Sequence, residues 1–289
     1  GRPHIHVLRE TEHEGYYAFF EWLRRTRPET AAQFRHTASS DSDVGPFEGA
    51  ALFIPWLQDP VRERAPDLFD RVSALEAAYA ARGVPTVNPV RVLSHAIKSR
   101  ALPTMRAAGV RTARSVLVQP ETPFRAIVEA VGLPFIVRND QGHGGYLRVV
   151  ETPADLAAID WRQLPHPLAV EFIDTRGADG HFRKYRYLFA GDAGVARHLI
   201  IASSWNAHAQ HRVRSEEHVA EEQAFVTSLN PYHDALNRVR KALELDYVAF
   251  DYSLFPDGEL VVWEPNPYPV LWESGTDPAQ NLDVQEGHM

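Results

Sequence analysis

The sequence predicts an α/β protein in which a small N-terminal domain with a parallel sheet precedes two α+β lobes. Three observations lead to this prediction. Strand-like and helix-like segments alternate through residues 1–88, as in a parallel sheet with crossover helices. Residues 134–150 run strand, glycine-rich turn, strand. Two β-rich runs near the end of the chain flank Pro256-Asp257-Gly258, which is a strong hairpin signal.

Bulk properties exclude several classes of protein. The composition, 44% hydrophobic and 24% charged over 289 residues, is typical of a globular protein. The formal net charge of −8 argues against nonspecific nucleic-acid binding, which needs a basic surface. The absence of cysteine excludes thiol catalysis, disulfides and thiolate metal sites. No apolar run approaches the ~20 residues of a membrane span, and no signal peptide is visible. We expect a cytoplasmic enzyme with neither nucleic-acid nor membrane partners.

The N-terminal domain is expected to end near Asn88. Strands are predicted over 4–8, 50–57 and 84–88, helices over 15–27 and 67–82, and a polar loop over 37–45. In the second helix, Leu68, Val72, Leu75 and Tyr79 fall on one apolar stripe. Strand, helix, strand, helix, strand is the order of a small parallel domain.

The rest of the chain is expected to form two lobes, at 89–168 and 169–289. Thr152 is a plausible cap for a short helix. Helices are predicted over 89–109, 123–131, 153–159, 216–228 and 232–245, and strands over 115–118, 134–137, 146–150, 168–173, 182–190 and 195–202, before the final hairpin.

The final hairpin carries the strongest indication of a site. If Asp257-Gly258 is a two-residue turn, Asp251 lies directly opposite Glu264, and alternation places Asn266 on the same face. Opposed carboxylates about 5 Å apart repel unless a positive charge lies between them. Three oxygen ligands suit Mg²⁺, which completes its shell with waters and substrate phosphates. A hairpin edge with its acids in water is the alternative.

Basic residues and glycines supply candidate anion contacts. Only three lysines occur, Lys98, Lys184 and Lys241, and the last is most simply a solvated helix residue. Lys184 and Arg186 share one face of a predicted strand. The turn at 139–145 would let backbone N–H groups close over an anion, although alone it also fits a loose hairpin.

The order of these features resembles the ATP-grasp superfamily over roughly residues 88–271. Asn88, Lys98 and Gly109 are similar to its Asn, its first Lys and the small-residue turn that enters a strand. The run 134–138 followed by 142–145 resembles the second phosphate-binding position and its flexible loop, and 169–173 is similar to the hinge strand. Asp251, Glu264 and Asn266, followed by Pro267 and Pro269, resemble its magnesium triad.

The resemblance implies an ATP-grasp fold after a small N-terminal parallel α/β domain, with ATP as cofactor. Lys98 and Arg138 would contact the α and β phosphates, although the family usually has lysine where Arg138 stands. Adenine would bind the hinge backbone near Glu171 and Ile173, with Phe172 against the ring. The triad would hold one or two Mg²⁺ ions, with Mn²⁺ as a substitute. The ATP-binding residues implied are Lys98, Arg138, His143, Gly144, Gly145, Glu171, Phe172, Ile173 and Lys184.

The resemblance further implies a ligase. A carboxylate attacks the γ-phosphorus, and an amine then displaces phosphate from the acylphosphate, leaving ADP. Arg186 and Arg197 are the expected stabilisers of the acylphosphate and its oxyanion. Asn206-Ala-His208 is similar to the Asn-x-His of ligases that add glutamate to a ribosomal protein, but the Arg-Gly-Gly that follows there is replaced here. His208 is therefore a base, a substrate contact or a structural residue, and the expected acceptor pocket contains His198, Trp205 and Asn206.

Other functions remain open at this stage. The chain also resembles D-alanine–D-alanine ligase and glutathione synthetase. We therefore expect the acid and the amine to be small molecules or peptides. A nucleotide-binding regulatory module of the synapsin kind would share the fold without turnover. A phosphotransferase would stop at a phosphorylated acceptor. A homodimer is common in the superfamily.

Overall fold

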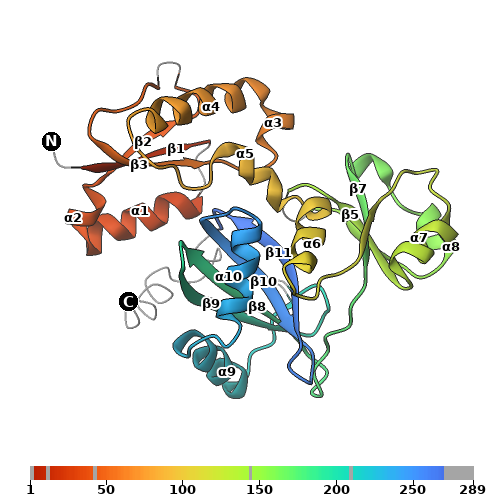
Figure 1. Ribbon diagram of the computed structural model, residues 1–289. Coiled ribbons are helices and arrows are strands. Elements are labelled where there is room, and N and C mark those ends of the chain that lie inside the picture. The colour runs from red at the N-terminus through yellow and green to blue at the C-terminus, as the bar shows by residue number, and fades with distance from the viewer. Residues whose placement is uncertain (1–2, 11–13, 42–43, 143–144, 208–210, 270–289) are drawn as a thin grey trace.

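The computed structural model describes residues 3–10, 14–41, 44–142, 145–207 and 211–269, arranged as three sheets with helices around them (Figure 1). His143, Gly144 and His208, which the sequence nominated for the site, lie outside the described residues. Within the described part, no helix has the length and apolar character needed to cross a lipid bilayer.

The N-terminal domain is a parallel sheet in the order β2-β1-β3, with helices on both faces (Figure 1). Adjacent residues of β1 point to opposite faces, so Val7 packs with α1 and Leu8 packs with α4. The elements are β1 His4–Arg9, α1 Glu14–Thr26, α2 Pro28–Ala31, β2 Phe34–Ala38, β3 Ala50–Trp56, α3 Val61–Arg64 and α4 Pro66–Ala80.

The third strand of this sheet is not the one that the sequence predicted. Residues 34–38, which run into the expected loop, form β2, whereas 84–88 makes only an isolated bridge between Thr86 and Phe53. Pro85 accepts a hydrogen bond from Phe53 but has no N–H to donate, so this segment cannot continue a ladder.

The central sheet is antiparallel, in the order β4-β7-β5-β6. Thr152 caps α8 through a capping box with Asp155, as the sequence predicted. The lobe boundary expected after residue 168 falls inside β7, which lies in the middle of this sheet. The elements are β4 Ser115–Leu117, α7 Phe124–Val131, β5 Phe135–Asn139, β6 Leu147–Val150, α8 Pro153–Ala157, η2 Trp161–Gln163 and β7 Pro167–Glu171.

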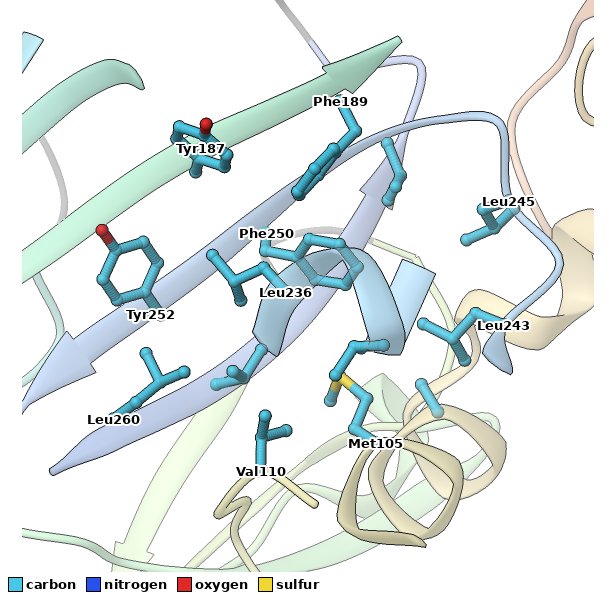
Figure 2. Packing of buried hydrophobic residues seen from close by; sticks show 14 of the residues in the cluster. Met105, Val110, Tyr187, Phe189, Leu236, Leu243, Leu245, Phe250, Tyr252 and Leu260 are labelled. Carbon is cyan, nitrogen blue, oxygen red and sulfur yellow. The ribbon is translucent and has the colours of Figure 1, made fainter. Parts of the chain in front are cut away.

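The C-terminal sheet, in the order β11-β10-β8-β9, buries one face under α10 and α6. Figure 2 shows Phe189 and Phe250 of the sheet packed with Leu236 of α10 and Met105 of α6. The helix expected over 89–109 is broken, and its last part, α6, belongs to this core. The elements are α5 Val90–Leu93, η1 Ser94–Ala96, α6 Lys98–Ala107, β8 Phe182–Ala190, β9 Ala193–Ala202, α9 Glu216–Thr227, α10 His233–Ala242, β10 Tyr247–Leu254 and β11 Leu260–Pro267.

The final hairpin has the predicted pairing but not the predicted turn. Phe255 donates its N–H to Glu259 across a three-residue loop, and Gly258 takes the positive φ of +85° that closes it. This loop shifts the register by one residue. A bulge at Trp263 shifts it back, so Asp251 lies opposite Glu264 as expected.

Asn88 joins the N-terminal domain to the C-terminal sheet. Its side-chain oxygen accepts the N–H groups of Asp246 and Tyr247 at 2.7 and 3.1 Å, and its Nδ2 donates to the Tyr247 carbonyl at 2.6 Å. Asn88 is fully buried and has a φ of 46°, a conformation that Asn tolerates better than most residues. Beside it, Trp56 stacks on Tyr268 with ring centroids 5.0 Å apart.

We expect Asn88→Ala to lower the free energy of unfolding by about 2–4 kcal/mol, because it leaves buried backbone groups without partners and adds strain at positive φ. Urea denaturation measures this loss. Asn88→Gly removes the same hydrogen bonds without the strain, so its loss should be smaller. An unchanged urea midpoint for Asn88→Ala would show that this junction contributes nothing to stability.

Candidate functional site

A cavity of about 170 Å³ lies between the central and C-terminal sheets and collects most of the nominated residues. Its lining includes basic and acidic side chains from both lobes, hinge residues after β7, and part of the segment that follows β9. The nominated residues that line it are Lys98, Arg138, Glu171, Phe172, Ile173, Lys184, Trp205, Asn206, Asp251 and Glu264.

One row of polar residues crosses the C-terminal sheet. Glu264 pairs with Asp251, Asp251 with Arg186, and Arg186 with His198 on four successive strands. Arg186 donates two hydrogen bonds to Asp251, at 2.6 and 2.8 Å, and Lys184 Nζ lies 3.8 Å from the same carboxylate. Burial acts to raise the pKa of Asp251, but the charges of Arg186 and Lys184 outweigh it and hold the pKa below its usual range.

Glu264 faces cations from two other elements. Lys98 Nζ lies 3.7 Å from its carboxylate and also donates to the Gly142 carbonyl at 2.9 Å, while Arg138 lies 3.8 Å away. Burial lowers the pKa of Lys98; the charge of Glu264 opposes this shift, and that of Arg138 adds to it. Arg138 belongs to the central sheet, so this contact joins the two lobes across the cavity.

The opposed acids therefore do not need a metal ion to lie close together. Lys98 and Arg138 beside Glu264, with Lys184 and Arg186 beside Asp251, supply the positive charge that the hairpin requires.

The face of the hairpin that carries Asp251, Glu264 and Asn266, called the acidic face below, nevertheless has the donor set of a magnesium site. Asn266 pairs with Ala249, two positions along β10 from Asp251, and so lies on the same face. Its buried Nδ2 has no hydrogen-bond partner among the described residues, so no hydrogen bond of this atom fixes the orientation of the amide. Two carboxylates and an amide carbonyl are the hard oxygen donors that Mg²⁺ prefers. Asp251, Glu264 and Asn266 thus fit the ion in chemistry.

Lys98 is placed by Asp140, which sequence reasoning overlooked. Ile97 is extended and breaks the helix, so Lys98 is the first residue of α6. Asp140 accepts from the N–H of Ser99 at 2.7 Å and from its hydroxyl at 2.6 Å, which satisfies the open end of α6. In the sequence, the one feature that could have indicated this contact is the position of Asp140 next to the glycine-rich turn.

The end of β7, which the sequence analysis likened to a hinge strand, is held by Arg114, a second residue that sequence reasoning missed. Arg114 donates to the Glu171 carboxylate from its N–H, Nε and Nη2, at 2.9, 3.2 and 3.2 Å. Burial raises the pKa of Glu171, but these hydrogen bonds bring it below its usual value. The N–H groups of Glu171 and Phe172 already donate to Arg114 and Pro134 carbonyls.

The remaining nominated residues divide between the cavity wall and the sheet interior. Trp205 packs edge to face against Phe172, with centroids 5.5 Å apart, and Gly145 has a φ of +89°. Arg197 is buried and His198 half-buried in β9, and neither is part of the described cavity lining. Burial and the charge of Arg186 lower the pKa of Arg197 to about 10, against the opposing influence of Tyr247.

Several residues that line the cavity were not nominated individually from the sequence. Apolar side chains from α6, β5 and β7, some of them inside the runs 134–138 and 169–173, form a wall suited to a flat ring. The lining residues that were not nominated are Leu102, Ala113, Ile136, Val170, Thr175, Phe182, Arg183, Ala207, Ser253 and Trp263.

The N-terminal domain reaches the site through Gln58 and Asp59. They line a small pocket of about 20 Å³ together with Lys98, Asp140 and Glu264. Burial and the charge of Glu63 raise the pKa of Asp59 to about 7, against the charges of nearby arginines and Lys98.

The raised pKa of Asp59 predicts a dependence of stability on pH. Between about pH 4 and 7 the folded protein keeps a proton that the unfolded chain has released, so stability falls as the pH rises. Urea denaturation at pH 5 and pH 8 measures this change. From pH 5 to pH 8 the free energy of unfolding should fall by roughly 2 kcal/mol more in the wild type than in Asp59→Asn. Glu76 also titrates near pH 7 but is common to both proteins. Asp70→Asn, at an exposed position, is the control. A wild-type-like pH profile for Asp59→Asn would contradict the assignment.

Comparison with known proteins supports the architecture. Neither a family model nor a curated protein sequence matches the chain. Among solved structures, the ATP-grasp ligase PsnB with minimal precursor, Mg and ADP is 16% identical, with a TM-score of 0.58 over 98% of this chain and 97% of that chain. The macrocyclase MdnC bound with precursor peptide MdnA, from Microcystis aeruginosa MRC, is 12% identical, with a TM-score of 0.60 over 97% of both chains. The chain therefore has the fold of the ATP-grasp ligases.

Proposed function

We propose that this protein is an ATP-dependent ligase that joins a carboxylate to an amine through an acylphosphate and releases ADP and phosphate. The observation that supports this most is the gathering of Lys98, Arg138 and Lys184 beside Asp251 and Glu264 in one cavity. Cations next to paired acids are what a magnesium nucleotide needs.

The charges suit a triphosphate. ATP carries about four negative charges, and Lys98, Arg138 and Lys184 line the cavity on three separate elements. Lys98 acts as a point charge, and Arg138 offers a planar fork for a phosphate oxygen pair. The apolar wall near Ile136 and Val170 would hold the adenine ring, with the backbone of Glu171 and Ile173 at its edge.

The metal would sit on the acidic face. Asp251, Glu264 and Asn266 would hold Mg²⁺, which neutralises charge on the transferred phosphoryl group when bound. Lys98 and Lys184 would then turn from the carboxylates toward phosphate oxygens. PsnB, a ligase of the same fold, has been solved with Mg and ADP.

The substrate roles follow from which side chains are already engaged. Arg186 donates two hydrogen bonds to Asp251, so we assign Arg186 to positioning that acid. Arg197 remains our candidate for stabilising developing negative charge, and His208 for a base, a substrate contact or a structural role. His198, Trp205 and Asn206 remain acceptor-pocket candidates. Because PsnB and MdnC have been solved with precursor peptides, we propose a peptide as one of the substrates.

The direct test is a phosphate-release assay with ATP, Mg²⁺ and libraries of peptides and amino acids, read with product masses. Ligation yields ADP, phosphate and a product lighter by one water than its substrates. AMP as the sole nucleotide product would contradict the proposal. Saturable ATP binding without turnover would indicate a regulatory module, and a stable phosphorylated acceptor a phosphotransferase.

Glu264→Gln should abolish Mg²⁺-dependent turnover, with a loss of at least 100-fold, because it removes a ligand charge facing Lys98 and Arg138. The variant should stay folded by circular dichroism, since only one partly exposed carboxylate is changed. Glu259→Gln, on the exposed part of the same hairpin, is the matched control and should keep its activity. Full activity in Glu264→Gln would refute the ligand assignment.

Arg138→Lys distinguishes two modes of phosphate contact. If Arg138 binds phosphate through its fork, we expect KM for ATP to rise about tenfold, because lysine offers only a point charge. Arg148→Lys on the neighbouring strand β6 is exposed and should leave KM unchanged. An unaltered KM in Arg138→Lys would show that charge alone suffices.

A further inference from the structure

A cluster of three metal-ligating side chains lies away from the acidic face. Asp179 and His181 belong to the segment between β7 and β8, and His218 belongs to the first turn of α9. The loop is compact: Gly177 donates to the His181 carbonyl at 2.8 Å, and the N–H of His181 donates to Asp179 at 3.1 Å. Ser215 caps α9 by accepting the N–H of His218.

The spacing of the three ligands is close to that of a tetrahedral site. One ligand atom from each residue lies within 4.8 Å of the others, and His181 Nδ1 lies 3.4 Å from Asp179 Oδ2. Ligands about 2.0–2.1 Å from Zn²⁺ in a tetrahedron stand about 3.3 Å apart. The first pair already has this separation, His218 supplies a third ligand atom within 4.8 Å of the other two, and water would take the fourth position.

Both histidines carry a buried Nδ1 atom; that of His181 faces Asp179 at 3.4 Å, and that of His218 has no hydrogen-bond partner among the described residues. Their rings meet edge to face, with centroids 5.2 Å apart. A buried polar atom without a partner costs about 1–3 kcal/mol, and coordination of a metal ion would remove this cost.

The neighbouring charges prepare the carboxylate. Arg183 donates to both oxygens of Asp179, at 3.1 and 2.8 Å, and these hydrogen bonds hold the pKa of Asp179 well below its usual range. Glu221 in turn accepts from Arg183 at 2.6 and 2.9 Å and offsets its charge. Asp179 is thus ionised and oriented, as a ligand supported by outer hydrogen bonds must be.

We propose that Asp179, His181 and His218 bind one transition-metal ion of the Zn²⁺ class, with water as the fourth ligand, at a site separate from Asp251 and Glu264. Two imidazoles and one carboxylate select Zn²⁺, Co²⁺ or Ni²⁺ over Mg²⁺. The ion would tie the loop before β8 to α9. It would also fix Arg183, which lines the cavity between the two lobes.

The test is Zn²⁺ binding to the full-length protein after EDTA treatment and dialysis, by calorimetry in excess Mg²⁺ so that oxygen-rich sites are occupied. We expect one equivalent to bind, the melting temperature to rise with Zn²⁺, and Co²⁺ to give the absorption of a tetrahedral complex. The double variant His181→Ala/His218→Ala should bind that equivalent at least 100-fold more weakly. His166→Ala, at an exposed histidine outside the cluster, should bind it normally.

Asp179→Asn guards against misfolding of the histidine variant, since it keeps the side-chain shape and removes the ligand charge. It should weaken Zn²⁺ binding at least tenfold while the protein melts normally without metal. The proposal fails if the wild type and the double variant bind Zn²⁺ equally, or if His166→Ala loses as much affinity as the double variant. Binding of Zn²⁺ without a tetrahedral Co²⁺ spectrum would also overturn it.

Discussion

The site depends on keeping a buried carboxylate, Asp251, charged beside the partly exposed carboxylate of Glu264. Asp251 is only 2% exposed, and burying an ionised acid costs several kcal/mol unless cations and hydrogen bonds offset it. Arg186 provides both hydrogen bonds from the adjacent strand, and Lys184 adds a second charge two residues away. Because a buried pair is weak evidence for stability, this arrangement is better explained by a function that needs charge at that position.

The cations come from parts of the chain that meet only in the folded molecule. Lys98 begins α6, Arg138 lies on β5 of the central sheet, and Lys184 and Arg186 lie on β8. Glu264 lies within 4 Å of the first two. The electrostatic balance of the cavity therefore requires the central and C-terminal lobes to be packed correctly, which couples folding of the lobes to formation of the site.

Much of this could be predicted from local pattern, and the failures have physical causes. Alternation along strands identified the hairpin and the shared face of Asp251, Glu264 and Asn266. The turn was nevertheless wrong, and the pairing was right only because the bulge at Trp263 compensates for the longer loop.

Tertiary contacts account for what the sequence could not show. The break before Lys98 depends on Asp140, which is distant in sequence, and the hinge depends on Arg114. The strand at 34–38 has little apolar alternation and forms because a parallel neighbour, β1, pairs with it. Zinc-type ligands at Asp179, His181 and His218 are likewise invisible in sequence, since a loop and a helix bring them together.

The crossing of the chain between sheets determines how the central sheet is attached to the rest of the protein. Helix α6 packs in the C-terminal core, the next strand, β4, belongs to the central sheet, and the chain returns after β7. Residues 115–171 thus form an insertion attached by two tethers, and Arg114 on one tether is bonded to Glu171 at the start of the other. The insertion is also held to the C-terminal lobe by side chains, because Ser99 bonds to Asp140, Lys98 donates to Gly142 and Arg138 faces Glu264. These contacts between the lobes are all polar or charged, whereas the two cores that they join are apolar and share no residue.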